Sequence, residues 1–169
     1  AVKTATIATD RTITQGSFNI FYSGYNGDAP ATADWDPKDD TKLVAGARWA
    51  SNDSKVLIGT VSGTTMTWGD PVSIFAGDWQ TGRSSIRFNP NPATSGEFAV
   101  VYEDREGSPV NQLRVARCSY TGNTVTLHQN YSITTDYHDG GTLDFDISSG
   151  VLYMAWKYED MDYSKMSVK

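Results

Sequence analysis

The chain has little cysteine, few basic residues and no long apolar run, and each shortage excludes a class of protein. Cys118 is the only cysteine among 169 residues, so no internal disulfide framework can form. Lys and Arg number 14 against 20 Asp and Glu, which gives a net charge of −6 and disfavours a surface for nucleic acid or anionic lipid. No run approaches the roughly 18 apolar residues of a membrane helix. We therefore expect neither nucleic-acid binding nor membrane insertion.

Helical periodicity is missing too, and a repeat of β-strand segments takes its place. Each repeat opens with a short strand whose aromatic residue precedes Asp or Asn, at Trp35, Phe88 and Phe145. A more apolar segment follows, of the kind that suits a central strand covered on both faces. A hairpin in which Thr alternates with apolar residues completes the unit. The apolar segments are 43–49, 98–104 and 152–158, and the hairpins are 4–14, 56–68 and 113–127.

One unit therefore predicts four antiparallel strands, which is the blade pattern of a β-propeller. A β-sandwich is the alternative, but it does not explain why the segments recur in the same order. We expect an all-β fold of β-propeller-type blades that forms part of a larger or oligomerically completed propeller. The predicted boundaries place an outer hairpin and a connection at 1–32, blades at 33–82 and 84–140, and a partial blade at 141–169.

The two ends of the sequence fall at nearly the same phase of this repeat. Ser167-Val168-Lys169 resembles Ala1-Val2-Lys3, and both belong to the first part of the outer hairpin. Too few blades are present to close a ring. The favoured interpretation is a piece of a longer chain, and the alternatives are a ring completed by several copies or by strand exchange.

Residues 58–72, Ile-Gly-Thr-Val-Ser-Gly-Thr-Thr-Met-Thr-Trp-Gly-Asp-Pro-Val, resemble a blade unit found in tandem in phage virion proteins. Tyr102-Glu103-Asp104 resembles the Tyr-x-Asp end of the strand that precedes the hairpin in that family. The resemblance covers most of 33–169, although 117–123 departs from the Gly-Thr-Val-Ser-Gly pattern. It implies a non-enzymatic tail, fibre or capsid-surface component in a virion or extracellular assembly. Its partners would be other structural protein subunits, bound by assembly or adhesion.

An acidic cluster surrounds Pro37 and is the candidate metal site. Carboxylate oxygens this close together could hold calcium. The spacing lacks the ordered pattern of established calcium loops, so a solvated turn is the alternative. The cluster consists of Asp34, Asp36, Asp39 and Asp40.

The aromatic residues suggest a second function. Most tryptophans occupy repeat-linked positions that favour packing between blades. Trp79 and Tyr25 lie instead in predicted loops, where an exposed ring could stack on a sugar or a partner protein. A carbohydrate-binding, lectin-like propeller module is therefore the first alternative.

Catalytic patterns are weak throughout the sequence. Residues 62–68 resemble the tail of the Asp-box of sialidase propellers but lack its Asp, and the arginines show no pattern that gathers them. Cys118 has no His and Asn set near it and reads as a small packed side chain. His128 and His138 form neither a metal set nor a triad. We expect no enzymatic activity, and a fragment of a propeller glycosidase is the second alternative.

Overall fold

The computed structural model describes residues 2–7, 13–19, 31–48, 54–75, 84–91, 96–104, 112–133 and 138–158. Every regular element in these ranges is a β-strand, which confirms the all-β prediction. None of the described residues forms a helix that could cross a membrane. The strands are β1 (Val2–Ile7), β2 (Ile13–Asn19), β3 (Ala31–Trp35), β4 (Lys42–Arg48), β5 (Ser54–Ser62), β6 (Thr65–Trp68), β7 (Val72–Phe75), β8 (Ser84–Phe88), β9 (Glu97–Asp104), β10 (Gln112–Thr121), β11 (Thr124–Ser132), β12 (His138–Phe145) and β13 (Leu152–Tyr158).

Strands that follow one another in the sequence pair antiparallel in four sheets. Sheet A is the hairpin β1–β2, and sheet D is the hairpin β12–β13. Sheet B has the order β3-β4-β5-β6, with β7 also on β5, and sheet C has the order β8-β9-β10-β11. The same meander therefore occurs twice, as the repeat predicts. The described strands form no closed ring, so the propeller itself stays a prediction.

The fourth strand of sheet B is split in two. β6 pairs with residues 59–62 of β5, and β7 pairs with residues 54–56 of the same strand. Both lie along one edge of β5, because β4 occupies the other edge. Pro71 falls between β6 and β7 and has no N–H to donate to the ladder. The interruption therefore explains why sheet B contains one strand more than sheet C.

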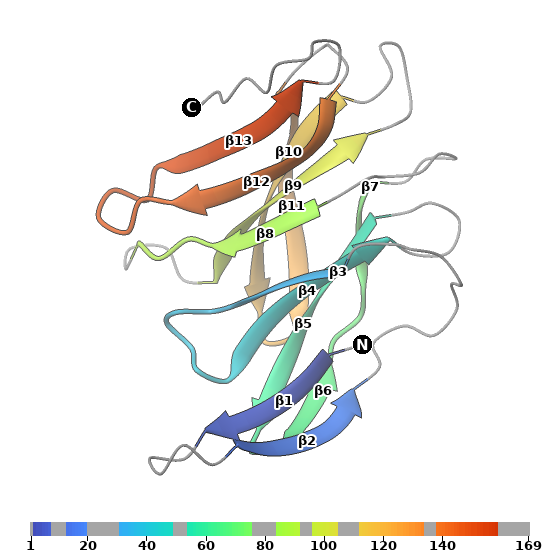
Figure 1. The fold of residues 1–169 in the computed structure, drawn as a ribbon, viewed down its shortest axis with the longest axis vertical. Coiled ribbons are helices and arrows are strands. Elements are labelled where there is room, and N and C mark those ends of the chain that lie inside the picture. Colours follow the sequence, from blue (N-terminus) through green and yellow to red (C-terminus); the bar gives the residue numbers. More distant parts are fainter. Residues whose placement is uncertain are drawn as a thin grey trace.

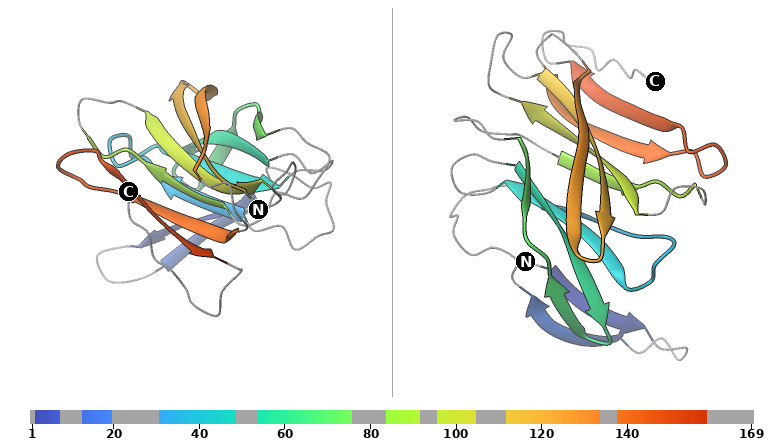
Figure 2. Two further views of the ribbon diagram at one scale, coloured as in Figure 1. Left: turned by 90° about the horizontal axis from the view of Figure 1, so that it is seen from above. Right: turned by 180° about the vertical axis from the view of Figure 1, so that it is seen from behind.

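The sheets lie face to face along the long axis of the molecule. Sheet A is at one end, sheet D is at the other, and sheets B and C lie between them (Figure 1). The first strands of the three later units, β3, β8 and β12, are neighbours, and the two further views show the same stacking (Figure 2). The chain is thus a row of sheets, each of which must cover a face of the next.

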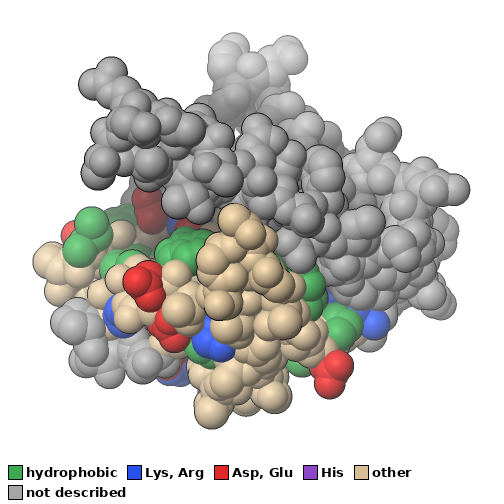
Figure 3. Space-filling view, turned by 90° about the horizontal axis from the view of Figure 1, so that it is seen from below, with side chains coloured by type: hydrophobic (Ala, Val, Ile, Leu, Met, Phe, Trp, Pro, Cys, Tyr) green, Lys and Arg blue, Asp and Glu red, His purple; other side chains and the backbone are tan. Residues whose placement is uncertain are grey.

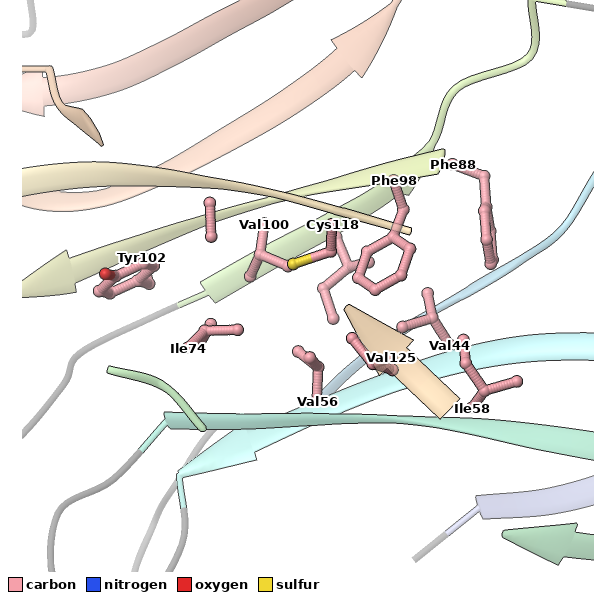
Figure 4. Close-up of a cluster of buried hydrophobic side chains, with 12 residues drawn as sticks. Val44, Val56, Ile58, Ile74, Phe88, Phe98, Val100, Tyr102, Cys118 and Val125 are labelled. Carbon is pink, nitrogen blue, oxygen red and sulfur yellow. The ribbon is translucent and has the colours of Figure 1, made fainter. Parts of the chain in front are cut away.

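Two apolar clusters fill the spaces between the sheets. The first joins sheet B, through Val44 and Ile58, to sheet C, through Phe98 and Val100 (Figure 4). The second joins sheet C to sheet D through side chains that include Val101, Leu113, Leu143 and Met154. Cys118 is fully buried in the first cluster, which confirms that it is a packed side chain.

β9 contributes to both clusters because its side chains alternate between the two faces of sheet C. Phe98, Val100 and Tyr102 face sheet B, whereas Ala99 and Val101 face sheet D. The prediction of a strand covered on both faces is confirmed here. The same prediction is wrong for 152–158, because only one face of that strand is covered. Met154 on the covered face is 7% exposed, whereas Tyr153 on the other face is 44% exposed. Sheet D has a described neighbour on one face only.

Leu113→Ala tests the packing between sheets C and D. Leu113 is fully buried in the second cluster, so its truncation leaves a cavity that the sheets fill only in part. We expect the free energy of unfolding to fall by about 2–5 kcal/mol, as measured by urea denaturation. The matched control is Leu127→Ala, whose side chain is 36% exposed and whose loss should cost below about 1 kcal/mol. Equal losses in the two variants would contradict this packing.

Candidate functional site

The turn after the first strand is built in the same way in all three units. The side-chain Oδ1 of Asp36 accepts the N–H of Lys38 at 2.8 Å. Asn89 accepts the N–H of Asn91 at 3.0 Å in the next unit, and Asp146 accepts that of Ser148 at 2.8 Å in the last. Each is an Asx turn, in which a side chain replaces a backbone acceptor. The repeated aromatic-Asp/Asn motif is therefore the closure of the first hairpin of each unit.

The side chains that close the three turns accept different numbers of hydrogen bonds. Asp146 accepts two bonds from Ser148 and one from the N–H of Ser149. These bonds, led by the Ser148 hydroxyl, stabilise the carboxylate and lower the pKa of Asp146 to about 2. The lysine of the first turn, Lys38, donates to the carbonyl oxygen of Asn91 in the second. The first two turns therefore join sheets B and C as well as closing their own hairpins.

Three of the four acidic residues predicted to hold calcium have separate partners within the protein. Asp34 Oδ2 accepts the N–H of Phe88 at 2.8 Å, and Asp39 accepts the N–H and hydroxyl of Thr41. The hydroxyl bond is the main reason that the pKa of Asp39 is lowered, and Asp40 is exposed. Within the described ranges, no group of three His, Cys, Asp or Glu side chains could hold a metal ion. The calcium site thus stays a prediction that the arrangement does not support.

Asp36 ties sheet B to sheet C. Its side chain is 2% exposed, and its Oδ2 accepts the hydroxyl of Tyr120 at 2.6 Å. Burial raises the pKa of Tyr120, and the bond to Asp36 raises it further. Because a buried carboxylate needs hydrogen-bond donors, this pair fixes the first turn of sheet B on β10.

The Tyr-x-Asp end of β9 supports a second polar network. Asp104 is buried and accepts a bond from Arg114 at 3.0 Å. The Nδ2 of Asn130 lies 2.6 Å from the hydroxyl of Tyr102 and 2.9 Å from the carbonyl oxygen of Ile74 in β7. Burial raises the pKa of Tyr102 to about 12, so its phenol is neutral at ordinary pH. These polar groups connect sheet C to the edge of sheet B.

Three of the arginines whose side chains the structure describes lie in separate ion pairs. Arg114 pairs with Asp104, Arg117 with Glu97, and the Nε of Arg87 lies 4.0 Å from Oδ1 of Asp144. The remaining candidates for a sialidase-type cluster, Arg83 and Arg105, lie outside the described residues. The geometry therefore brings no arginine cluster together in the described part of the chain.

The nucleophilic candidates are equally separate. Ser119 Oγ lies 2.7 Å from His128 Nε2 on the exposed side of sheet C. Among the described side chains, no acid is hydrogen-bonded to the other ring nitrogen, so the third member of a triad is missing. Burial raises the pKa of Cys118 to about 12, which keeps it a thiol. The side chain of His138 lies outside the described part.

The two aromatic residues predicted to contact a ligand, Trp79 and Tyr25, lie outside the described residues. The structure does place another repeat-linked tryptophan differently from the prediction. Trp35 is 41% exposed and is not packed between sheets. It pairs with Leu43, so its side chain lies on the face of sheet B that is turned away from sheet C. Tryptophan at this repeat position is therefore exposed where phenylalanine in the next unit, Phe88, is buried.

An open hollow of about 290 Å³ lies beside the first strand of sheet D. Its wall combines an aromatic ring, Tyr153, with the charged groups of Arg87 and Asp144. Sequence reasoning missed it, although a signal exists. Asp34, Arg87 and Asp144 each stand directly before the aromatic residue of their unit. On the face seen in Figure 3, acidic and basic side chains of the described residues are interspersed.

No family model matches the chain, and no curated protein is significantly similar to it. The resemblance of 58–72 to phage virion blades thus stays a prediction. The sheet stack, the two sheet-to-sheet polar links and the hollow on sheet D are the features on which a function can be argued.

Tyr120→Phe tests the link between sheets B and C. The substitution removes the hydroxyl that Asp36 accepts and leaves a buried carboxylate oxygen short of a donor. We expect a loss of about 1.5–3 kcal/mol in the free energy of unfolding at pH 7, measured by urea denaturation. Tyr131→Phe, at a 49% exposed tyrosine, is the matched control and should change stability by about 0.5 kcal/mol or less. An unchanged stability in Tyr120→Phe would show that the bond does not join the sheets.

Proposed function

We propose that this chain is a non-enzymatic structural or adhesion module of a virion or extracellular assembly. It acts through protein–protein contacts made by its sheet faces. The observation that carries this proposal is the face of sheet D that no described sheet covers, on and beside which three of the exposed large apolar side chains of the described residues gather.

The register of β12 and β13 defines this face. Asp144 pairs with Tyr153 and Thr142 pairs with Ala155, so these four side chains lie on one side of the hairpin. Leu143 and Met154 alternate with them and pack against sheet C. The uncovered side is referred to below as the open face of sheet D.

Exposed apolar residues gather on and beside the open face. Tyr153 is 44% exposed, Val151 is 47% exposed, and Ile147 in the turn between the two strands is 79% exposed. Val151 lies directly before β13, two residues from Tyr153. Contiguous exposed apolar groups mark interaction sites in soluble proteins. The open face therefore has the character of a contact surface.

The polar groups of the described part also favour an assembly role. Asp34 and Asp36 link sheet B to sheet C, and Tyr102 and Asp104 belong to the network that reaches β7. These side chains hold sheets together. A resemblance of 58–72 to virion blades supports the same role.

The double variant Ile147→Lys and Val151→Lys tests this proposal. In particles or extracellular material assembled with it, immunogold labelling by an antibody against the chain should fall at least tenfold, because charge on the open face opposes docking. Leu127→Lys, a change on β11 away from sheet D, should label like the unchanged chain. Circular dichroism melting curves would show that all three proteins fold. Unchanged chain that is absent from virions and from extracellular material would contradict the proposal.

Carbohydrate binding is the second candidate, and the hollow on sheet D favours it. An exposed aromatic ring beside charged and hydroxyl groups offers both a stacking surface and hydrogen bonds, as small-molecule sites do. The groups are those of Tyr153, Arg87, Asp144 and Thr142.

Glycan-array binding distinguishes this candidate from the first. If sugars occupy the hollow, Tyr153→Ala should reduce the array signal at least tenfold, since the stacking ring is lost. Tyr131→Ala, which removes a similarly exposed ring on β11, should leave the signal intact. An array on which the unchanged chain binds nothing would exclude this candidate.

A further inference from the structure

We propose that the open face of sheet D docks onto the exposed side of β3 in a second copy of this chain, so that copies join head to tail. The inference rests on the proposed function, because it names the partner for the protein–protein contacts. It is argued from the two sheet-to-sheet joints that the chain already contains.

Each full sheet has two different faces. One face carries the residue before the repeated aromatic, and we call it the leading face; it holds Asp34 in sheet B and Arg87 in sheet C. The other carries the aromatic itself, and we call it the following face; it holds Phe88 in sheet C. The register supports this division, since Arg87 pairs with Ala99 of the second cluster and Phe88 pairs with Phe98 of the first.

The joint between sheets B and C shows how the two kinds of face fit. The leading face of B receives the following face of C, and Asp34 accepts the backbone N–H of Phe88 at 2.8 Å. The ring of Phe88 lies in edge contact with Phe98 and Tyr120, with centroids 5.5 and 6.0 Å away. A carboxylate on one sheet thus binds the edge strand of the next, and an aromatic ring is buried beside it.

The joint between sheets C and D follows the same rule. The leading face of C supplies Val101 and Leu113, and the following face of D supplies Leu143 and Met154. Phe145, the repeated aromatic of sheet D, packs against this cluster as well. Both joints within the chain therefore bring a leading face to a following face.

The described part of the chain has one further exposed surface of each kind. The leading face of D presents Asp144, whose side chain is 83% exposed, together with Tyr153. Asp144 Oδ1 accepts the N–H of Phe145 at 2.9 Å and lies 4.0 Å from the Nε of Arg87, so Oδ2 is the oxygen that would meet a second copy. The following face of sheet B presents Trp35, which is 41% exposed. In the described part of the chain, β2 of sheet A contacts β6 of sheet B, and the ring of Trp35 stays exposed. The two surfaces lie on different sheets at opposite ends of the B–C–D stack, so one copy cannot join them (Figure 1).

The hydrogen-bonding groups of the two surfaces are complementary. Asp144 occupies the repeat position from which Asp34 binds Phe88. The bond from the N–H of Asp36 to the carbonyl oxygen of Lys42 sets the alternation of the β3–β4 ladder and turns the N–H of Trp35 away from β4. Asp144 of one copy can therefore accept the N–H of Trp35 in the second copy. Tyr153 and Val151 then cover the indole ring.

This contact uses different surfaces on the two copies and is heterologous. Such contacts add further copies until a ring closes, or else they continue as a filament. Each copy in the series would bury one leading and one following face. β3 and the ring of Trp35 would then have the environment that β8 and Phe88 have inside the chain.

Two variants that each spoil one face provide the test. Trp35→Lys damages the following face, and Tyr153→Lys damages the leading face. By sedimentation velocity, the unchanged chain should form oligomers beyond the dimer as its concentration rises, and each variant alone should stay monomeric. An equimolar mixture of the variants should form a dimer and nothing larger, because one intact leading face meets one intact following face. Leu127→Lys is the control and should form the same oligomers as the unchanged chain.

Other results would overturn the inference. These are an unchanged chain that remains monomeric, a single variant that still dimerises, or a mixture that stays monomeric although both variants give native melting curves. The outcome is distinguishable from failure of the proposed function. A monomeric chain that still labels particles would remove only the head-to-tail contact. A chain that forms the mixed dimer but is absent from virions and extracellular material would remove only the assembly role.

Discussion

The burial of β9 on both faces is the constraint on which the rest of the structure depends. A strand that is apolar at consecutive positions is stable only if a sheet covers each side of it. Sheets B and D supply these covers through the two apolar clusters. The position of each remaining sheet follows, because sheet C fixes the direction in which its neighbours stack. Sheet D is covered by sheet C on one side only. The other side of β13, which carries Tyr153, has no described cover.

Apolar packing sets the distance between sheets, and polar groups set their alignment. Asp34 in β3 accepts the N–H of Phe88, and Asp36 in the turn after β3 accepts the hydroxyl of Tyr120. Sliding of one sheet over the other would break both bonds, and the cost in free energy is greater at Asp36, whose carboxylate is buried. Hydrophobic burial has no such directional preference. The acidic residues thus specify which arrangement of stacked sheets is formed.

Much of the fold could be predicted from the sequence, because its signals are local. The recurrence of Trp35, Phe88 and Phe145 gave the strand order, and the alternation of Thr with apolar residues gave the hairpins. The site was less accessible. The acidic residues around Pro37 are close together in the sequence, which suggested a metal site. Their partners Phe88 and Tyr120 lie far away in the sequence, so the bonds to them could not be predicted. The exposure of Trp35 and the hollow beside Tyr153 depend on which sheet face is covered, and spacing along the chain does not record that.

Stacked repeats usually end in a sheet or helix whose outer surface is polar, since a terminal unit has no neighbour to cover it. The open face of sheet D is less polar than such a surface, with Tyr153 exposed on the side opposite the core contacts of β13 and Val151 exposed directly before that strand. It also retains Asp144 at the position where a carboxylate binds the next sheet. A surface adapted to solvent would need neither the apolar side chains nor that matched acceptor. The chemistry of this face therefore resembles that of the joints between sheets inside the chain. Contact with another sheet of the same repeat would bury its apolar side chains and give its carboxylate a donor, whereas solvent would leave the apolar side chains exposed.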